Sequence, residues 1–166
     1  ERTILLKTMQ TLIEYSVDLL LDGAFAAVAA IGFGSISNVP FRAFKGCALL
    51  AAIGHATRYA LMHFAGIAII PAAFVAALII GLLAPRLSHY WNLPSESLAF
   101  PALLPMIPGM YAYRSVEALV MCFKSQAEAD FLHDYYLFAY NGMICVAIVM
   151  LMVFGVTIPI HVQKIK

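Results

Sequence analysis

Charged residues are scarce in this chain. Asp, Glu, Lys and Arg make up 11% of its 166 residues, whereas 63% are hydrophobic and the mean hydropathy is +0.90. A soluble domain carries about 25% charged residues, so this chain has too few charges to cover a globule in water. The net charge of +1 gives no indication of nucleic-acid binding. Long apolar runs without strict alternation favour membrane helices over barrel strands. The composition therefore predicts an all-α integral membrane protein.

Catalytic, redox and metal-binding patterns are also missing. The three cysteines, Cys47, Cys122 and Cys145, are isolated within apolar segments and form no CxxC pair, which is typical of small core residues. No GxSxG, HExxH or P-loop spacing occurs. His55 and His63 lie eight residues apart with no third ligand nearby, so they make a poor metal site. We therefore predict neither an enzyme nor a bound cofactor.

The apolar runs predict a single transmembrane domain over residues 16–160, with about five helices. Residues 1–15 precede it as an amphipathic helix or a plain helical extension, and residues 161–166 follow as a basic tail. Polar loops are expected at 85–97 and 124–134. The predicted spans are 16–37, 42–64, 66–84, 97–123 and 135–159.

Five spans would place the two termini on opposite sides of the membrane. More basic residues then fall on the side of the C-terminus, so the positive-inside rule favours a cytoplasmic C-terminus. The small residues of the first span allow close helix contacts, which leaves a homo-oligomer open. The basic residues counted are Arg42, Lys45, Arg86, Lys164 and Lys166 on one side against Arg2, Lys7 and Lys124 on the other.

The fourth predicted span contains helix-breaking residues. Pro101, Pro105 and Pro108 are followed by Gly109, in a segment that is otherwise apolar. A proline in a helix interior removes a backbone hydrogen bond, and in lipid the freed carbonyl finds no water. We expect a broken helix at 105–109, with a new helix starting near Gly109 and its N–H groups aimed into the protein. The alternative is a packing kink without ligand contact.

The second predicted span carries a small and polar seam. At 100° per residue, Cys47, Ala51, Gly54, His55 and Arg58 share one side of this helix. An arginine deep in a membrane is costly and usually pairs with a carboxylate or lines a pathway. Two interpretations follow: Arg58 staples helices by pairing with a carboxylate, or it contributes to a substrate or proton path. The carboxylates available are Asp18, Asp22 and Glu117.

Carrying a proton and binding a substrate would require other side chains beside Arg58. His55 has an ordinary pKa near ~6.5 and could carry a proton, although a bond to a neighbouring carbonyl is the plainer interpretation. Asp18 and Asp22 lie one turn apart on the first span and are alternative proton carriers. Tyr111 and Tyr113 follow the break, where a phenol can bond a substrate, although such residues more often serve in packing.

Two stretches form a distinctive pair: NVPFRAFKGCALLAAIGHATRYALM at 38–62 and LLPMIPGMYAY at 103–113. They resemble the signature regions of the threonine/serine exporter family, in particular its small YjjB-type subunit. The resemblance implies a secondary exporter of the cell inner membrane that uses the proton gradient. It also implies threonine, serine or dicarboxylates such as succinate as substrates, and a larger YjjP-type membrane subunit as partner. Arg114 and Asp22 are not expected from the family pattern. The motif positions are Asn38, Pro40, Arg42, His55, Arg58, Pro105, Pro108, Gly109 and Tyr113.

The sequence thus predicts a subunit of a proton-linked exporter of small polar metabolites. The proton-coupling residues would be Asp18, Asp22 and His55. One alternative is a scaffolding subunit whose partner carries the transport path, and another is a homo-oligomeric channel with a ring of Arg58. The predicted substrate-binding residues are Arg58, His55, Pro105, Pro108, Gly109, Tyr111, Tyr113 and Asn38.

Overall fold

The computed structural model describes residues 2–164, with side chains for residue 9 and for residues 13–163. Over this part of the chain the structure is helical and contains no strand, which confirms the all-α prediction. The elements in order are α1 (Arg2–Ile36), η1 (Phe41–Ala43), α2 (Phe44–His63), α3 (Ile69–Trp91), α4 (Ser95–Leu103), η2 (Leu104–Met106), α5 (Gly109–Lys124) and α6 (Glu128–Lys164).

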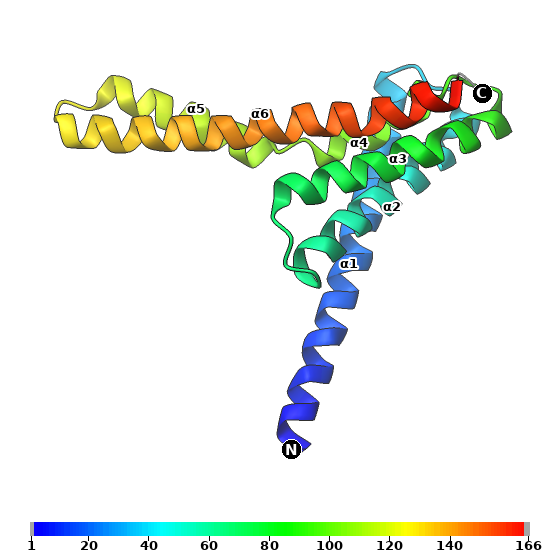
Figure 1. Ribbon diagram of the computed structural model, residues 1–166, viewed down its shortest axis with the longest axis horizontal. Helices are drawn as coiled ribbons and strands as arrows, with labels where there is room; N and C mark the ends of the chain where they lie inside the picture. The colour runs from blue at the N-terminus through cyan, green and yellow to red at the C-terminus, as the bar shows by residue number, and fades with distance from the viewer. Residues whose placement is uncertain (1, 165–166) are drawn as a thin grey trace.

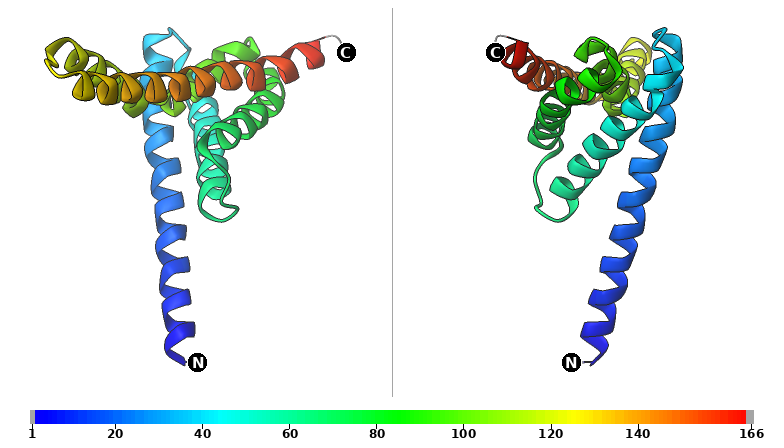
Figure 2. Two further views of the ribbon diagram at one scale, coloured as in Figure 1. Left: turned by 60° about the vertical axis from the view of Figure 1, so that its left-hand side comes forward. Right: turned by 90° about the vertical axis from the view of Figure 1, so that its right-hand side faces the viewer.

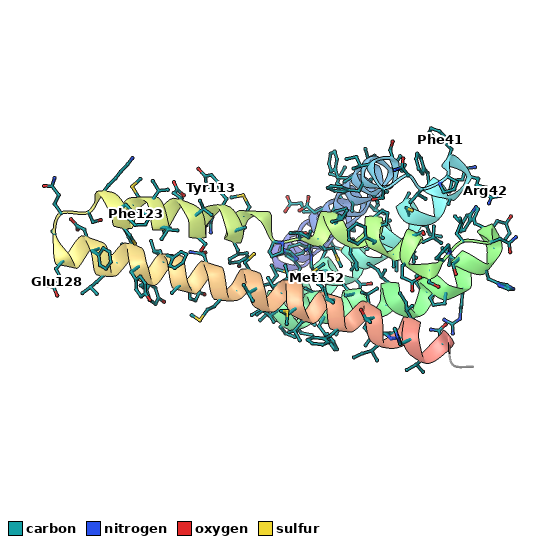
Figure 3. All side chains as sticks on the ribbon, turned by 90° about the horizontal axis from the view of Figure 1, so that it is seen from above. Phe41, Arg42, Tyr113, Phe123, Glu128 and Met152 are labelled. Carbon is teal, nitrogen blue, oxygen red and sulfur yellow. The ribbon has the colours of Figure 1, made fainter. Side chains whose placement is uncertain are left out.

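The helices form a central cluster with two projections (Figures 1 and 2). In the cluster α2 packs against α1 and α3, while α3 lies along the C-terminal part of α6. The N-terminal half of α1 extends away from the cluster on one side. The hairpin of α5 and α6 extends away on another, and α5 packs mainly against α6 (Figure 3).

Helix α1 is continuous from Arg2 to Ile36, so residues 2–15 are a direct extension of the first predicted span. The side chains of 1–8 and 10–12 lie outside the described residues, and the expected amphipathic pattern there stays a prediction. The helix ends where the sequence predicts. Asn38 adopts the left-handed conformation with φ 55°, and the Val39 N–H bonds the Gly34 carbonyl at 2.9 Å.

Among the described residues, three helices are long and apolar enough to cross a membrane: Ile13–Ile36, Ile69–Trp91 and Glu128–Gln163. Helices α4 and α5 contain 9 and 16 residues. At a rise of about 1.5 Å per residue, neither alone crosses about 30 Å of hydrocarbon. The count of five spans therefore stays a prediction.

The prediction of a loop at 85–97 is wrong, because α3 continues through Pro85 to Trp91. A proline costs one backbone hydrogen bond, and side chains bond carbonyls near this turn. Arg86 Nη1 and Gln163 Nε2 each donate to the Leu82 carbonyl, both at 3.4 Å. The helix ends instead at Asn92, which takes the left-handed conformation with φ 50°.

The predicted linker at 124–134 is also mostly helical, because α6 already begins at Glu128. Glu128 and Asp130 lie in the first turn of α6, where negative side chains favour the helix dipole. The helix thus starts well before the apolar run that marked the fifth span. Only residues 125–127 separate α5 from α6, so the two helices form a tight hairpin.

Close packing joins α3 to α6. The buried face of α3 consists mainly of small residues, and Gly81 lies directly against the backbone of α6. A Cβ atom built at Gly81 would lie 2.6 Å from the Val156 carbonyl oxygen. Glycine is therefore required for the two helices to approach this closely. The small residues of this face are Ala72, Ala73, Ala76, Ala77, Gly81 and Ala84.

Candidate functional site

The fourth predicted span is broken where the sequence indicates. The short helix η2 ends at Met106, Ile107 is extended with ψ 130°, and α5 begins at Gly109. Pro105 and Pro108 lack backbone N–H groups, so they cannot continue a helical ladder through this point. Local bonds close the turn instead, including one from the Gly109 N–H to the Ile107 carbonyl at 2.8 Å.

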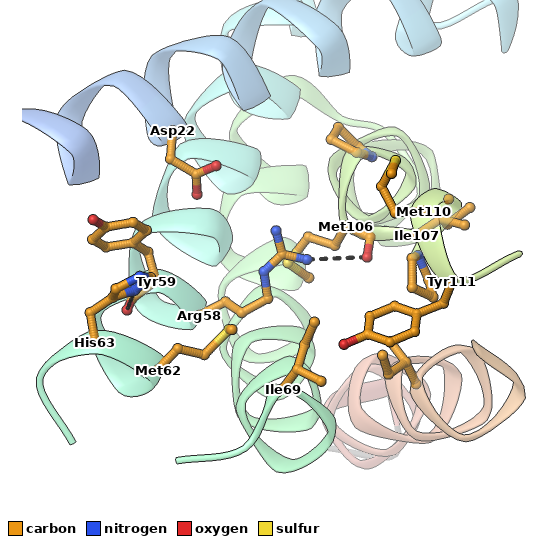
Figure 4. Close-up of a pocket in the computed structure, with 14 residues that line it drawn as sticks. Asp22, Arg58, Tyr59, Met62, His63, Ile69, Met106, Ile107, Met110 and Tyr111 are labelled. Carbon is orange, nitrogen blue, oxygen red and sulfur yellow. Dashed lines mark hydrogen bonds between the residues drawn. The ribbon is translucent and has the colours of Figure 1, made fainter. Parts of the chain in front are cut away.

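Arg58 of α2 reaches across to this break. Its Nη1 donates to the Met106 carbonyl oxygen at 3.2 Å (Figure 4). The guanidinium thus supplies a donor to a carbonyl at the end of η2, where the helical hydrogen-bond pattern stops. Among the described residues, no carboxylate oxygen lies within 4.0 Å of Arg58. Arg58 therefore does not join two helices through an ion pair, and its charge has no counterion within 4.0 Å among these residues.

His55 lies one turn before Arg58 and bonds a carboxylate of α1. Its Nδ1 is 3.1 Å from Asp22 Oδ2, and the same Nδ1 is 3.4 Å from Arg58 Nη2. The His55 side chain is buried, and its Nε2 has no hydrogen-bond partner among the described residues. The side-chain partner of His55 is thus a carboxylate, and the backbone carbonyl of Pro105 also interacts with the ring, as in the plainer interpretation of a histidine bonded to a carbonyl. Three ionisable groups from two helices therefore meet at one point.

A cavity of about 310 Å³ opens beside this cluster and the break (Figure 4). Such a volume is at the lower end of the range for small-molecule sites. Asp22 and Arg58 face it from α1 and α2, and the phenol of Tyr111 faces it from α5. His55 does not line the cavity but contacts Asp22 and Arg58, which do. The lining residues are Asp22, Arg58, Tyr59, Met62, His63, Ile69, Pro105, Met106, Ile107, Pro108, Gly109, Met110, Tyr111 and Ile148.

Besides His55, three residues predicted for the site lie outside this cavity. Asn38 ends α1, 16 residues after Asp22, which corresponds to about 24 Å along a helix. Its left-handed backbone gives it a role in ending the helix. Tyr113 is 62% exposed and lies on the outward side of α5 (Figure 3). Asp18 is exposed and accepts a long bond of 3.5 Å from the Tyr59 hydroxyl.

Two residues of the cavity rim were not predicted. Tyr59 and His63 lie on α2 with their rings stacked at a centroid distance of 3.9 Å, and both face the cavity (Figure 4). Helical spacing was the available signal, because Met62 follows Arg58 by four positions and His63 follows Tyr59 by four. These residues give the site an aromatic wall opposite the break.

Comparison with known proteins identifies a family whose model matches this chain. The model of the family described as "Threonine/Serine exporter, ThrE" matches residues 22–162. An uncharacterized protein of Haemophilus influenzae is 42% identical over 106 residues, which cover 64% of this chain and 35% of that protein. The matched part thus spans about a third of the length of this relative. No solved structure matches the chain. Because the family model covers most of the chain, including the Asp22–His55–Arg58 cluster and the break, the chain belongs to the threonine/serine exporter family.

Proposed function

We propose that this chain is a subunit of a proton-linked exporter of small polar metabolites, and that the cavity at the break binds the exported solute. The observation that carries the proposal is the pair of opposite charges in one cavity. Arg58 and Asp22 both line it, yet they form no ion pair within 4.0 Å. A threonine or serine molecule carries a carboxylate and an ammonium group, and can therefore bridge such a gap.

The chemistry of the lining suits this solute. A guanidinium binds a carboxylate through paired hydrogen bonds, and Asp22 offers an acceptor to an ammonium group. The positive end of α5 points at the same cavity from Gly109 and adds attraction for a carboxylate. A dicarboxylate such as succinate would use Arg58 and the end of α5 but would leave Asp22 without a positive partner. The lining thus favours amino acids over dicarboxylates.

Proton coupling is assigned to Asp22 and His55. A carboxylate and an imidazole in direct contact can share a proton, and His55 Nδ1 lies 3.1 Å from Asp22 Oδ2. A proton on Asp22 removes the charge that would hold the ammonium group of the solute. Proton entry would therefore weaken solute binding, which is what an exporter driven by the proton gradient requires.

The complete transporter is proposed to include a larger membrane subunit of the YjjP type, in the cell inner membrane. The support for a larger partner is the length of the Haemophilus relative. The part that matches this chain is about a third of that relative, so most of its length corresponds to further sequence. The hairpin of α5 and α6 also exposes large apolar side chains, including Tyr113, Phe123 and Tyr136, to lipid or to another subunit. A cytoplasmic C-terminus stays part of the proposal.

A scaffolding role is the second candidate. It predicts that Arg58 and the break are sealed in separate packing contacts. Here the two are joined by a hydrogen bond and line the same open cavity, which favours a transport role. A channel with a ring of Arg58 finds less support, because this side chain bonds Met106 of its own chain.

Efflux measurements test the proposal. Vesicles that contain this chain together with its partner subunit are loaded with labelled threonine, serine or succinate. We expect a proton gradient to accelerate efflux of threonine and serine, and an ionophore that collapses the gradient to remove the acceleration. Succinate is expected to move more slowly. Gradient-independent or absent flux of all three solutes would contradict the proposal.

Replacing one carboxylate tests the proton step. The variant Asp22→Asn keeps a side chain of similar size but cannot ionise, so we expect weaker solute binding and a residual efflux that no longer responds to the gradient. Asp18→Asn is the control, because Asp18 lies one turn away and does not line the cavity. Equal responses of both variants to the proton gradient would count against Asp22 as the coupling group.

A further inference from the structure

The hairpin of α5 and α6 carries a second cavity of about 460 Å³, open on one side, that the proposed function does not use. Arg114 and Glu117 face it from α5, and Asp134 and Asn141 face it from α6. Polar groups of this number are unusual on a hairpin whose outer surface is apolar. The lining residues are Arg114, Glu117, Ala118, Met121, Asp134, Leu137, Tyr140 and Asn141.

The charges in this second cavity are not paired with one another. Arg114 precedes Glu117 by three residues on the same helix, a spacing at which such side chains commonly pair. Among the described residues, Arg114 nevertheless forms no ion pair within 4.0 Å with Glu117 or with Asp134. The Asp134 carboxylate accepts a bond from the Ser125 hydroxyl at 2.9 Å instead. A cation and two carboxylates thus share one cavity, as Arg58 and Asp22 share the first.

Buried polar contacts hold the walls of this cavity in place. The Ser115 hydroxyl donates to the Phe138 carbonyl at 2.9 Å and so ties α5 to α6. Asn141 is buried and donates to the Leu137 carbonyl of its own helix at 2.8 Å. Gly142 allows the approach, because a Cβ atom there would lie 3.0 Å from the Ser115 hydroxyl oxygen. The spacing of Arg114 from Asp134 is therefore set by a packed hairpin.

One stripe of α5 connects the two cavities. Tyr111 faces the first cavity, and Arg114, Ala118 and Met121 face the second at intervals of three, four and three residues. From Tyr111 to Met121 this stripe rises about 15 Å. Met121 also lines a third cavity at the hairpin tip, together with Lys124, Ser125, Asp130, His133 and Asp134. The three cavities thus follow α5 along its whole length of 16 residues, which is about 24 Å.

We infer that the cavity around Arg114 is a second binding station for the same zwitterionic solute. Arg114 takes the carboxylate, and Glu117 with Asp134 takes the ammonium group. This inference rests on the proposed function and extends it, because a solute that leaves the cavity at Arg58 meets the next matching charges along α5.

Protection of engineered cysteines tests the second station. The three native cysteines are replaced by alanine, and the variants are examined in membranes that also contain the partner subunit. Met121→Cys lines the second cavity, and its neighbour Val120→Cys does not, although the native side chains are 44% and 45% exposed. Threonine at ten times its Kd is expected to slow alkylation of Met121→Cys by N-ethylmaleimide about tenfold. Val120→Cys should react at an unchanged rate.

A second matched pair reports on the first cavity. Met110→Cys lines it and Val116→Cys lines neither cavity, with native exposures of 63% and 61%. Protection of Met110→Cys without protection of Met121→Cys would overturn the second station and leave the proposed function intact. Protection at neither position would overturn both. Equal slowing of a cavity variant and its control would indicate a general conformational change and would also overturn the second station.

Arg114 itself is then tested in the Met121→Cys and Met110→Cys variants. Adding Arg114→Gln to Met121→Cys should remove the protection by threonine, while the protection of Met110→Cys persists. Arg114→Lys keeps the charge and should restore part of it. Protection of Met121→Cys that survives Arg114→Gln would contradict the assignment of the solute carboxylate to Arg114.

Discussion

Replacing Arg58 by glutamine is expected to weaken threonine binding at least about 30-fold and to abolish measurable efflux. Loss of one partner from a desolvated, hydrogen-bonded charge pair costs about 2–5 kcal/mol, and about 2 kcal/mol already corresponds to a 30-fold change in affinity. Glutamine removes the charge, and its side chain is two bonds shorter, so the bond to the Met106 carbonyl is lost as well. Assembly with the partner subunit is therefore measured beside solute binding, because assembly reports on the structural role of this bond. Equilibrium binding and vesicle efflux are the measurements.

Arg86→Gln is the matched control for this variant. Arg86 is exposed on α3, lines neither cavity, and donates to the Leu82 carbonyl one turn away on its own helix. It should bind and transport like the unchanged protein. If Arg58→Gln instead fails to assemble with the partner, or if both variants transport normally, the solute-binding role of Arg58 is wrong. Loss of assembly would support a structural role for this arginine.

Replacing Gly81 by alanine is expected to cause the largest loss of stability among glycine variants of the helices. The added Cβ would lie 2.6 Å from the oxygen and 2.9 Å from the Cα of Val156. Both are backbone atoms, so relief requires α6 to shift as a whole. Overpacking of this kind typically costs about 1–3 kcal/mol, and a contact with backbone falls at the upper end. Thermal unfolding in detergent, followed by circular dichroism, measures the effect.

Gly32→Ala provides the comparison, because a Cβ atom there meets nothing within 4 Å. Alanine favours a helix over glycine by about 1 kcal/mol, so this variant should be as stable as the unchanged chain or slightly more so. Gly155→Ala should resemble Gly81→Ala, since its Cβ would lie 2.9 Å from the Phe74 carbonyl oxygen. Equal midpoints for Gly81→Ala and Gly32→Ala would show that the two helices are not held at this distance.

The sequence predicts the break and the polar seam because both depend on local chemistry. Prolines interrupt a helix wherever it lies, and the burial of Cys47, Gly54 and His55 follows from helical spacing alone. Helix ends were predicted less well, since hydropathy marks contact with lipid and does not mark where a helix stops. This explains why α3 extends beyond Pro85 and α6 begins at Glu128.

Residues of the site that depend on tertiary contact were harder to predict. Asn38 and Arg58 belong to one sequence signature, yet α1 and α2 form an antiparallel pair, with Asn38 at the end remote from Arg58. Tyr111 and Tyr113 are two residues apart, which on a helix turns the second away from the cavity that the first lines. The bond between Arg58 and Met106 joins residues 48 positions apart and has no local signal.

The Nδ1 atom of His55 has two neighbours with opposite requirements. Asp22 accepts a hydrogen bond and needs a proton on Nδ1, whereas Arg58 donates one and needs a lone pair there. A single nitrogen satisfies only one of them at a time, because it carries either a proton or a lone pair. The imidazole therefore has two alternative hydrogen-bonding states. In one, Nδ1 donates to Asp22 of α1, and in the other, Nδ1 accepts from Arg58. Transfer of one proton to or from Nδ1 is enough to exchange the two states. The protonation of this atom thus decides whether the Arg58 guanidinium, which also bonds the break, is held by His55.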